Sequence, residues 1–209
     1  PVMLSIGAES GLHRADRNGV RIWRAGLRNL DRPDLKRRQH PAARTAWHLL
    51  DSYSVPMQPL LRRVLQAQQP DVVSPHNLPG WSAAAWKPIA HIGIPSLQVL
   101  HDAYPLCPKT TMYRGGHGNC TDPCAGCRLL RLPHRALSRR VSAVVGVSRF
   151  ILDRHLQAGY FAGVPIQHVI PNPRDAAELG VADAPVRTAG AALRIGFIGR
   201  LDPTKGVEL

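Results

Sequence analysis

The sequence of 209 residues is short of aromatic side chains, acidic side chains and long apolar runs. Phe, Trp and Tyr make up 5% of the residues, which is little for a protein that stacks nucleic-acid bases. No window approaches the roughly 18 to 20 apolar residues of a membrane-spanning helix. The chain begins Pro1-Val2-Met3, with neither an initiator methionine nor the basic and apolar segments of a signal peptide. Because this opening is already strand-like, we expect that sequence precedes residue 1.

The shortage of acidic side chains leaves a strongly basic chain. Fourteen Asp and Glu residues face 27 Lys and Arg residues, for a formal charge of +13. This charge favours anionic partners, such as nucleic acid, an acidic membrane surface or phosphorylated small molecules. A generally basic, arginine-rich proteome is the alternative explanation. With 44% apolar residues, the chain can bury a core for one ordinary domain plus a remnant, or for two small domains.

Short apolar segments alternate with segments that have the apolar spacing of a helix. We expect strands at residues 2–6, 20–24, 71–74, 96–100, 143–147, 167–170 and 193–198, that at 71–74 being buried. The first two strands are joined by a polar, glycine-bearing segment. Helices are expected at residues 42–51, 56–68, 82–91 and 148–158. This alternation predicts an α/β fold with a parallel sheet covered by helices on both faces.

Polar side chains follow two of these predicted strands. Ligands bind beyond the carboxyl ends of the strands in such sheets, so the residues just after each strand are the candidates for a site. His76 and Asn77 follow one strand, and His101 and Asp102 follow the next along the chain. A neutral imidazole at such a place can exchange a proton with a reacting hydroxyl group. The alternative for each is a structural histidine, and His76 would then bond loop backbone and cap the next helix.

All four cysteines lie in a segment, at about 105–133, that breaks the alternation. Cys107, Cys120, Cys124 and Cys127 are spaced C-x12-C-x3-C-x2-C. The last pair has the spacing of half a zinc site, so a structural tetrahedral zinc that fastens a long loop is one interpretation. Unliganded packed thiols are another, and a disulfide is a third, which a reducing cytosol disfavours. A catalytic zinc needs an open coordination position and is not indicated.

Two further segments place polar groups where a helix is expected to begin. Ser148 lies between a predicted strand and a predicted helix, which suffices to explain it as a helix N-cap; a phosphate or hydroxyl contact there is a secondary interpretation. Arg200 and Lys205 flank a turn after the last predicted strand, followed by Gly206. Two cations beside a helix N-terminus form a site the size of a diphosphate, although this spacing also arises by chance.

The order of these motifs along the chain resembles glycosyltransferase family 4. The motifs are DVVSPHNLPGWS (71–82), LQVLHDAYPLC (97–107), the cysteine-rich segment, VVGVSRFILDRHLQAGYF (144–161), VIPNP (169–173) and IGFIGRLDPTKGVEL (195–209). Their combination is far more specific than any one of them. The resemblance implies the GT-B fold, in which two Rossmann-like domains face a cleft. The histidine-aspartate motif followed by the cysteines is similar to a subgroup found in bacterial surface-polysaccharide synthesis.

The resemblance implies roles for the residues on the N-terminal side. His101 matches a histidine near the donor sugar and the acceptor hydroxyl, for which we expect a positioning or charge-stabilising role rather than that of a general base. His76 and Asn77 match a loop that shapes the acceptor side, and Asp102 is a further substrate-binding candidate.

The resemblance also implies a reaction and the residues that bind its donor. Arg200 and Lys205 match the basic pair that holds the donor's diphosphate in the motif G-R-L-x-x-x-K-G. The implied reaction moves a sugar from a nucleotide diphosphate sugar to an acceptor, with retention at the anomeric carbon and without a catalytic cofactor. Charge that develops on the departing diphosphate would be stabilised by these two cations.

The resemblance sets the expected domain boundaries. Residues 1–173 would form an N-terminal, acceptor-side Rossmann-like domain that lacks its first strand and carries the cysteine-rich insert. Residues 174–191 would be a linker, and residues 192–209 the first strand and turn of the donor-binding domain. The family's first strand with its glycine-rich loop, and its acidic pair in the second domain, have no match here. We therefore expect the 209-residue chain alone to have no transferase activity.

The expected partners follow from the resemblance and the charge. They are a nucleotide sugar donor, a glycan or lipid-linked acceptor, and an anionic membrane that the protein contacts from the cytoplasm. Nucleic acid is not an expected partner. A basic, zinc-fastened nucleic-acid-binding module is the alternative from another class, although no recognition-helix pattern or aromatic strand motif supports it. A nucleotide-sugar epimerase, or a GT-B protein without activity, is a second alternative.

Overall fold

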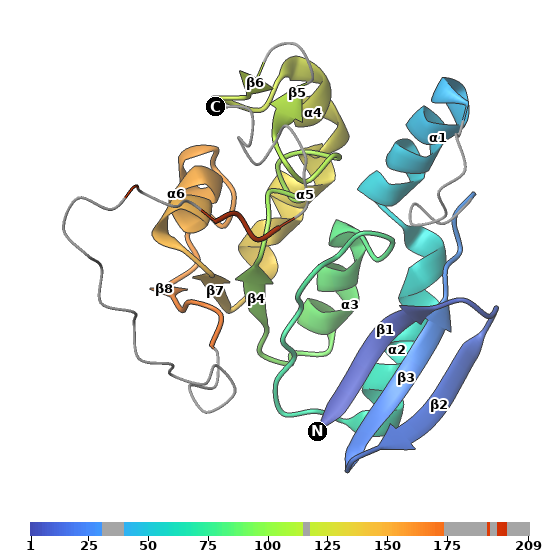
Figure 1. The fold of residues 1–209 in the computed structure, drawn as a ribbon. Coiled ribbons are helices and arrows are strands. Elements are labelled where there is room, and N and C mark those ends of the chain that lie inside the picture. The colour runs from blue at the N-terminus through green and yellow to red at the C-terminus, as the bar shows by residue number, and fades with distance from the viewer. Residues whose placement is uncertain (31–39, 115–117, 174–191, 193–195, 200–209) are drawn as a thin grey trace. The chain divides into compact units, whose positions relative to one another are not determined.

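The computed structural model describes residues 1–30, 40–114, 118–173, 192 and 196–199 (Figure 1). Contacts divide the chain into two units, Pro1–Pro171 and Asn172–Leu209. The predicted linker at 174–191 lies outside the described residues, as do Arg200 and Lys205. Of the strand expected at 193–198, only residues 196–198 are described, and these are not in a strand. The fold is therefore described for the first unit.

The first unit alternates strands and helices, as the sequence pattern predicts. In chain order its strands and α-helices are β1 (Val2–Gly7), β2 (Leu12–Arg17), β3 (Val20–Gly26), α1 (Pro41–Ser52), α2 (Gln58–Gln68), α3 (Trp86–His91), β4 (Leu97–Leu100), β5 (Tyr113–Arg114), β6 (Gly118–Asn119), α4 (Ala125–Leu130), α5 (Leu132–Leu137), β7 (Ala143–Gly146), α6 (Arg149–Gln157) and β8 (Ile166–Val169). Short 3-10 helices are η1 (Val55–Met57), η2 (Ala83–Ala85) and η3 (Ser138–Arg140). The predicted α/β class is confirmed.

Two three-stranded sheets provide most of the strand pairing. One has the order β4-β7-β8, and both of its pairs are parallel, with Val99 opposite Val145 and Val145 opposite His168. The other has the order β1-β3-β2, in which β3 runs parallel to β1 and antiparallel to β2. Parallel neighbours need long crossover connections. Helices α4 and α5 lie between β4 and β7 and helix α6 between β7 and β8, whereas β1 and β3 are connected through β2.

The antiparallel strand β2 differs from the sequence-based expectation of a polar connection. Its side chains are almost all exposed, so burial of apolar surface does not account for the formation of this strand. A tight turn does: Asn18 and Gly19 both have left-handed backbone angles, with φ of 51° and 74°. Two such residues match the right-handed twist of a two-residue hairpin, and Asn-Gly is the pair that adopts them most readily.

The segment at 71–74 was expected to be a buried strand, and that expectation is wrong about its burial. Val72 is 59% exposed, and Val73 forms only an isolated parallel bridge to Ser96. Backbone bonds connect this segment to β4 on one side, since Leu97 N donates to Val73 O at 2.9 Å. It is thus an extended edge segment beside β4, where Val72 has no layer to pack against.

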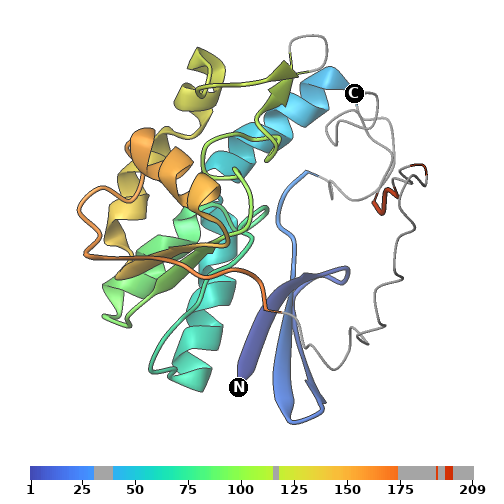
Figure 2. The same cartoon turned by 60° about the vertical axis from the view of Figure 1, so that its left-hand side comes forward.

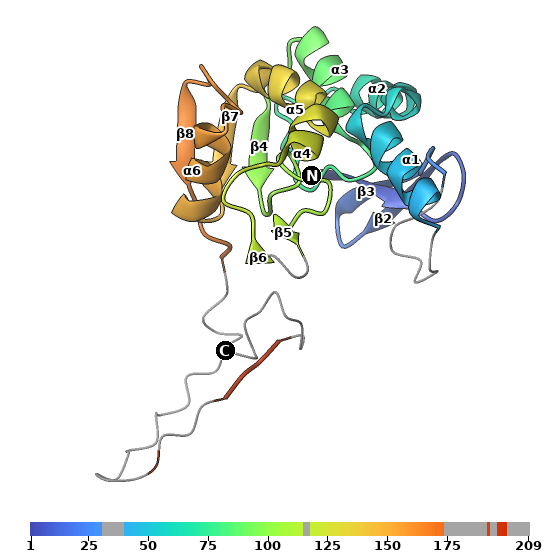
Figure 3. The ribbon, with the colours of Figure 1, turned by 90° about the horizontal axis from the view of Figure 1, so that it is seen from above.

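Helices α2, α3 and α5 enclose the apolar core. Figure 3 shows α3 between α2 and α5, and α2 lies beside the β1-β3-β2 sheet in Figures 1 and 2. Trp86 of α3 packs edge-on against Phe161, which follows α6, and against His134 of α5. Helix α2 buries Leu60, Leu61 and Val64 on one face. Burying each such side chain stabilises the fold by about 1.5–3 kcal/mol.

Helix α6 starts almost in contact with the end of β7. The Ser148 hydroxyl accepts a hydrogen bond from the Ile151 N–H at 3.3 Å, so Ser148 caps the helix as its position indicates. A Cβ atom at Gly146 would lie 2.7 Å from Leu152 Cβ and 2.8 Å from Ser148 O. Glycine therefore permits this close approach of strand and helix.

Candidate functional site

The predicted strand-end residues come together at one edge of the β4 sheet. The Val99 N–H donates to Pro75 O at 2.9 Å, so the edge segment and β4 end side by side. His76 and Asn77 continue from the first, and His101 and Asp102 from the second. All four line one shallow pocket, which accords with their choice from strand position alone.

The two imidazole rings are in direct contact. His76 Nδ1 and His101 Nε2 are 2.8 Å apart, and the rings stack with their centroids at 5.1 Å and an interplanar angle of 28°. Such a bond requires one nitrogen to carry a proton and the other to be free of one. On the far side of the first ring, Ser74 Oγ lies 3.2 Å from His76 Nε2. A serine hydroxyl and two imidazoles thus form a continuous chain along which a proton can move.

Burial shifts the pKa values of His76 and Asp102 in the directions that favour their neutral forms. Partial burial, and then the charge of His101, lower the pKa of His76, so this imidazole is neutral near pH 7. Burial raises the pKa of Asp102, while the hydrogen bond from the Tyr104 N–H to Asp102 Oδ1, at 2.9 Å, and His101 act against that rise. The site therefore presents neutral imidazole beside a partly buried carboxyl group.

A buried glutamine supports the loop that carries His76. Gln98 of β4 donates from Nε2 to His76 O at 3.2 Å, and its Oε1 accepts from Trp86 Nε1 at 2.8 Å. Gln98 is not among the residues predicted for the site. A polar residue inside a four-residue strand that is otherwise Leu, Val and Leu was the available signal.

A larger pocket opens beside Asp102, with a volume of about 480 Å³. This volume lies in the range of about 300–1,000 Å³ that small-molecule sites occupy. Its wall includes hydroxyl and amide side chains from the cysteine-rich insert, and apolar and cationic side chains from α6; these are Thr110, Thr111, Asn119, Thr121, Phe150, Ile151 and Arg154. The pocket thus offers uncharged hydrogen-bonding groups next to an aromatic ring.

Two α6 side chains in the wall of this pocket contact each other. The Arg154 guanidinium carbon lies 5.5 Å from the centre of the Phe150 ring, and its Nη2 donates to Cys120 O. Arg154 is therefore held by the insert. Phe150 is 70% exposed and presents its ring to the pocket and to solvent.

The four cysteines are free thiols, and Cys127 lies against two of the others, Cys107 and Cys124. Cys127 Sγ lies 4.0 Å from Cys107 Sγ, while Cys124 is exposed. Burial raises the pKa of Cys127 to about 12, and hydrogen bonds from Cys127 lower that of Cys124. Zn–S bonds of about 2.3 Å place two thiolates about 3.8 Å apart, which one pair approaches. Among the described residues no group of three or more His, Cys, Asp or Glu side chains is placed to hold a metal ion, so the zinc site stays a prediction.

Comparison with known proteins identifies the family. Residues 2–173 match the model of a family described as glycosyl transferase 4-like domain. The chain belongs to this family. A protein described as an uncharacterized 42.6 kDa protein in the cps region of Klebsiella pneumoniae is 26% identical over 206 residues. That alignment covers 99% of this chain and 53% of that protein, so the chain spans about half the length of the curated relative it matches. No solved structure matches.

The glycosyl transferase 4-like match confirms the resemblance seen in the motifs and covers both histidine loops. Within the part of the chain that the structure describes, no helix is long and apolar enough to cross a membrane. The predicted roles of His76, Asn77, His101 and Asp102 stay predictions, although the structure places all four at one site.

Proposed function

We propose that this protein transfers a sugar from a nucleotide diphosphate sugar to an acceptor hydroxyl, with retention at the anomeric carbon. The observation that carries the proposal is the family match over residues 2–173, within which the strand-end histidines meet. The match favours a transferase over the nucleic-acid-binding alternative.

The proposed step balances without a cofactor. The acceptor oxygen bonds to the anomeric carbon as the bond from that carbon to the diphosphate oxygen breaks, and the acceptor's proton passes to the departing diphosphate. Arg200 and Lys205 would stabilise the charge on that diphosphate. The histidine pair would orient the acceptor hydroxyl and the donor sugar at the strand ends, with His101 as a positioning group rather than a general base.

The pocket beside Asp102 is the proposed acceptor site. Its threonine and asparagine side chains suit the hydroxyl groups of a glycan, and the exposed Phe150 ring suits the apolar face of a sugar. Aromatic rings stack on such faces because carbohydrate C–H groups are weakly positive and the ring face is negative. A glycan or lipid-linked glycan is therefore the proposed acceptor class, in polysaccharide or glycolipid synthesis as the cps-region relative supports.

Contact with an anionic membrane is a further part of the proposal. Leu129 of α4 is 74% exposed and Leu132 of α5 is 59% exposed, with Arg128 and Arg135 exposed nearby. Apolar side chains flanked by cations favour the interface of an anionic bilayer. A cytoplasmic enzyme that meets its acceptor at the membrane would use such a surface.

The decisive test uses the full-length gene product, a panel of labelled nucleotide sugars and a membrane lipid extract. We expect label to move from one donor to the lipid or glycan fraction, and the rate to fall about 100-fold in His101→Ala. The matched control is His13→Ala, which removes an exposed histidine of β2. Transfer that His101→Ala leaves unchanged, or no transfer from any donor, would refute the proposal.

A further inference from the structure

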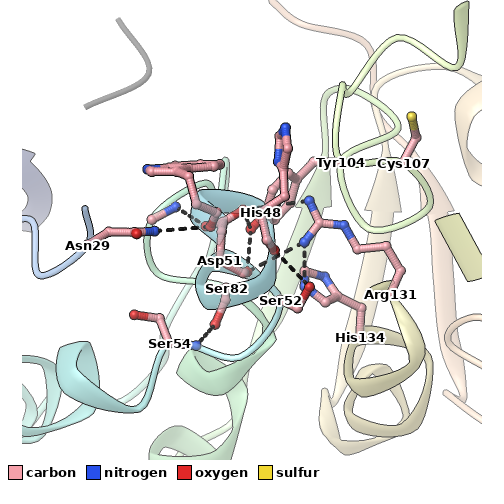
Figure 4. A network of polar contacts seen from close by, with 12 residues as sticks. Asn29, His48, Asp51, Ser52, Ser54, Ser82, Tyr104, Cys107, Arg131 and His134 are labelled. Carbon is pink, nitrogen blue, oxygen red and sulfur yellow. Dashed lines mark hydrogen bonds and ion pairs between the residues drawn. The ribbon is translucent and has the colours of Figure 1, made fainter. Parts of the chain in front are cut away.

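A buried carboxylate lies beneath the histidine site at the end of helix α1. The Asp51 side chain is fully buried, and its two oxygens have separate partners. Oδ1 accepts from the Gly80 N–H at 2.6 Å, and Oδ2 accepts from the Tyr104 hydroxyl at 2.7 Å. Figure 4 shows Asp51, near the end of α1, at the centre of this network and beside Tyr104.

The partners of Asp51 belong to the two loops that carry the histidines. Gly80 comes four residues after His76, and Tyr104 comes three residues after His101. One carboxylate therefore joins these loops, whose histidines are 25 residues apart in sequence. Hydrogen bonds to a charged group are shorter and about twice as strong as neutral ones.

An arginine from the far end of the cysteine-rich insert compensates the buried charge. Arg131 Nη2 lies 3.6 Å from Asp51 Oδ2, and the exposed fraction of both side chains is 0%. The guanidinium also lies 4.2 Å from the centre of the Tyr104 ring and donates from Nη1 to His134 Nε2 at 3.0 Å. Arg131 therefore contacts both the Asp51 carboxylate and the Tyr104 ring (Figure 4).

The backbone at Gly80 is closely confined by its neighbours, which limits the positions that its N–H can take. Gly80 has a left-handed φ of +85°, and a Cβ atom there would lie 2.4 Å from Ile6 Cδ1 and 2.9 Å from Leu27 Cδ1. Ile6 of β1 and Leu27, which follows β3, thus pack closely on Gly80, while Asp51 accepts a hydrogen bond from its N–H. The path from Gly80 back to His76 is only four residues long, so the ring follows the position of Gly80.

We propose that Asp51 is a positioning residue that sets the register between the two histidine loops, and thereby the contact between His76 and His101. The carboxylate is fixed by α1 and Arg131, and it fixes Gly80 in one loop and Tyr104 in the other. Without the carboxylate, each loop stays attached to its own strand, but the link that fixes the position of one loop relative to the other is lost. The consequence for sugar transfer rests on the proposed function, whereas the effect on the ring pair does not.

The test follows the two imidazoles by NMR in the 209-residue chain, using long-range correlations from ring protons to ring nitrogens across a pH titration. The variants are Asp51→Asn, which keeps the shape and removes the charge, and Tyr104→Phe, which removes one bond and keeps the carboxylate. The matched control is Ser138→Ala. Ser138 is also fully buried and accepts from the Phe161 N–H at 2.9 Å, away from both loops.

In the parent chain and in Ser138→Ala we expect one fixed tautomer pair, coupled through the bond between His76 and His101. In Asp51→Asn this fixed pair should be lost, and the pKa of His76 should rise toward its ordinary value as its ring separates from His101. Tyr104→Phe should show the same change to a smaller extent, and the double variant should do no more than Asp51→Asn. Should Asp51→Asn fail to fold, Tyr104→Phe decides the question alone.

Ring nitrogens that keep their parent tautomers and coupling in both variants would overturn the proposal, even if the variants melt earlier. In the full-length gene product, Asp51→Asn should lower kcat about 10- to 100-fold with little change in KM for the donor. Loss of ring coupling without any transferase activity in the parent would leave the positioning role standing and remove the proposed function instead.

Discussion

The histidine pair at the strand ends and the histidine beneath it differ in how their hydrogen bonds are completed. His76 is exposed, and among the described residues its ring bonds to Ser74 and His101, both of which a ligand can reach. His134 is fully buried, and its Nε2 accepts from Arg131, which in turn pairs with Asp51. Burial lowers the pKa of both histidines.

The difference shows how one residue type serves binding in one place and architecture in another. An exposed polar group exchanges its partner with water or a ligand at small cost in free energy. A buried ionised group that loses its partner keeps the whole penalty of desolvation. Asp51, Arg131 and His134 form a buried layer, and Ser74, His76 and His101 form an exposed layer. Substitutions in the buried layer should therefore destabilise the fold. Substitutions in the exposed layer should remove function and leave stability intact.

The largest effect should come from Arg131→Ala. Removing this side chain leaves the Asp51 carboxylate buried without a cation, which costs about 3–5 kcal/mol in the free energy of unfolding. Urea denaturation measures it, and the loss should be smaller at pH 5 than at pH 8 because a protonated Asp51 needs no counter-charge. Arg139→Ala is the control, since Arg139 is exposed and its replacement should change the free energy by less than about 0.5 kcal/mol.

Acidification should produce the next largest effect, through buried histidines. Burial lowers the pKa of His155 from 6.5 to about 4. The unfolded state then binds a proton between pH 6.5 and 4 that the folded state does not, so His155 makes stability fall as the pH falls through this window, by roughly 3 kcal/mol in all. Asp51, whose pKa burial raises to about 6, acts in the opposite sense between pH 6 and 3.8.

Comparison of the parent with His155→Phe isolates the histidine contribution. The variant keeps an aromatic ring among Tyr160 and Phe161 and lacks the titrating group. Denaturation at pH 7 and pH 4.5 should show a smaller loss of stability in the variant. Equal losses in both proteins would mean that His155 is reached by solvent in the folded state.

Ser148→Ala should have an intermediate effect. The Ser148 hydroxyl caps α6, and loss of such a cap costs about 1 kcal/mol. Thermal unfolding would measure this loss. Because we assign Ser148 to helix capping and not to a ligand, the rate of transfer by the full-length gene product should stay unchanged. A fall of more than about tenfold in that rate would show that Ser148 contributes to the functional site as well as to helix capping.

His101→Ala should have the smallest effect on stability. The ring is only partly buried, and its bond to His76 can be replaced by water, so the free energy of unfolding should change by less than about 1 kcal/mol. Denaturation of the 209-residue chain measures it. A loss as large as that of Arg131→Ala would erase the distinction between the two layers.

The exposed layer could be predicted from the sequence because strand ends are local features. His76 and His101 each follow a short apolar segment, and parallel pairing brings such ends together whatever the rest of the chain does. The buried layer could not be predicted in this way. Asp51 and Arg131 are 80 residues apart, and only the packing of α1 against the insert makes them neighbours.

Two elements show what local patterns miss. Strand β2 depends on the Asn18-Gly19 turn. This turn signal is present in the sequence, but the segment is polar and lacks the apolar alternation by which the other strands were predicted. The segment at 71–74 has the apolar pattern of a buried strand, but burial depends on whether another layer covers it. The pocket beside Asp102 similarly depends on how the insert folds back toward α6.

The close approach of β7 and α6 at Gly146 has a consequence for mutational scans. Any other residue at this position would push away the helix that carries Phe150, Ile151 and Arg154 into the pocket wall. A saturation screen for activity would then report Gly146 as intolerant of every substitution, although no atom of it needs to touch a substrate. Variants meant to alter the pocket should therefore change the side chains of α6 and keep Gly146 of β7.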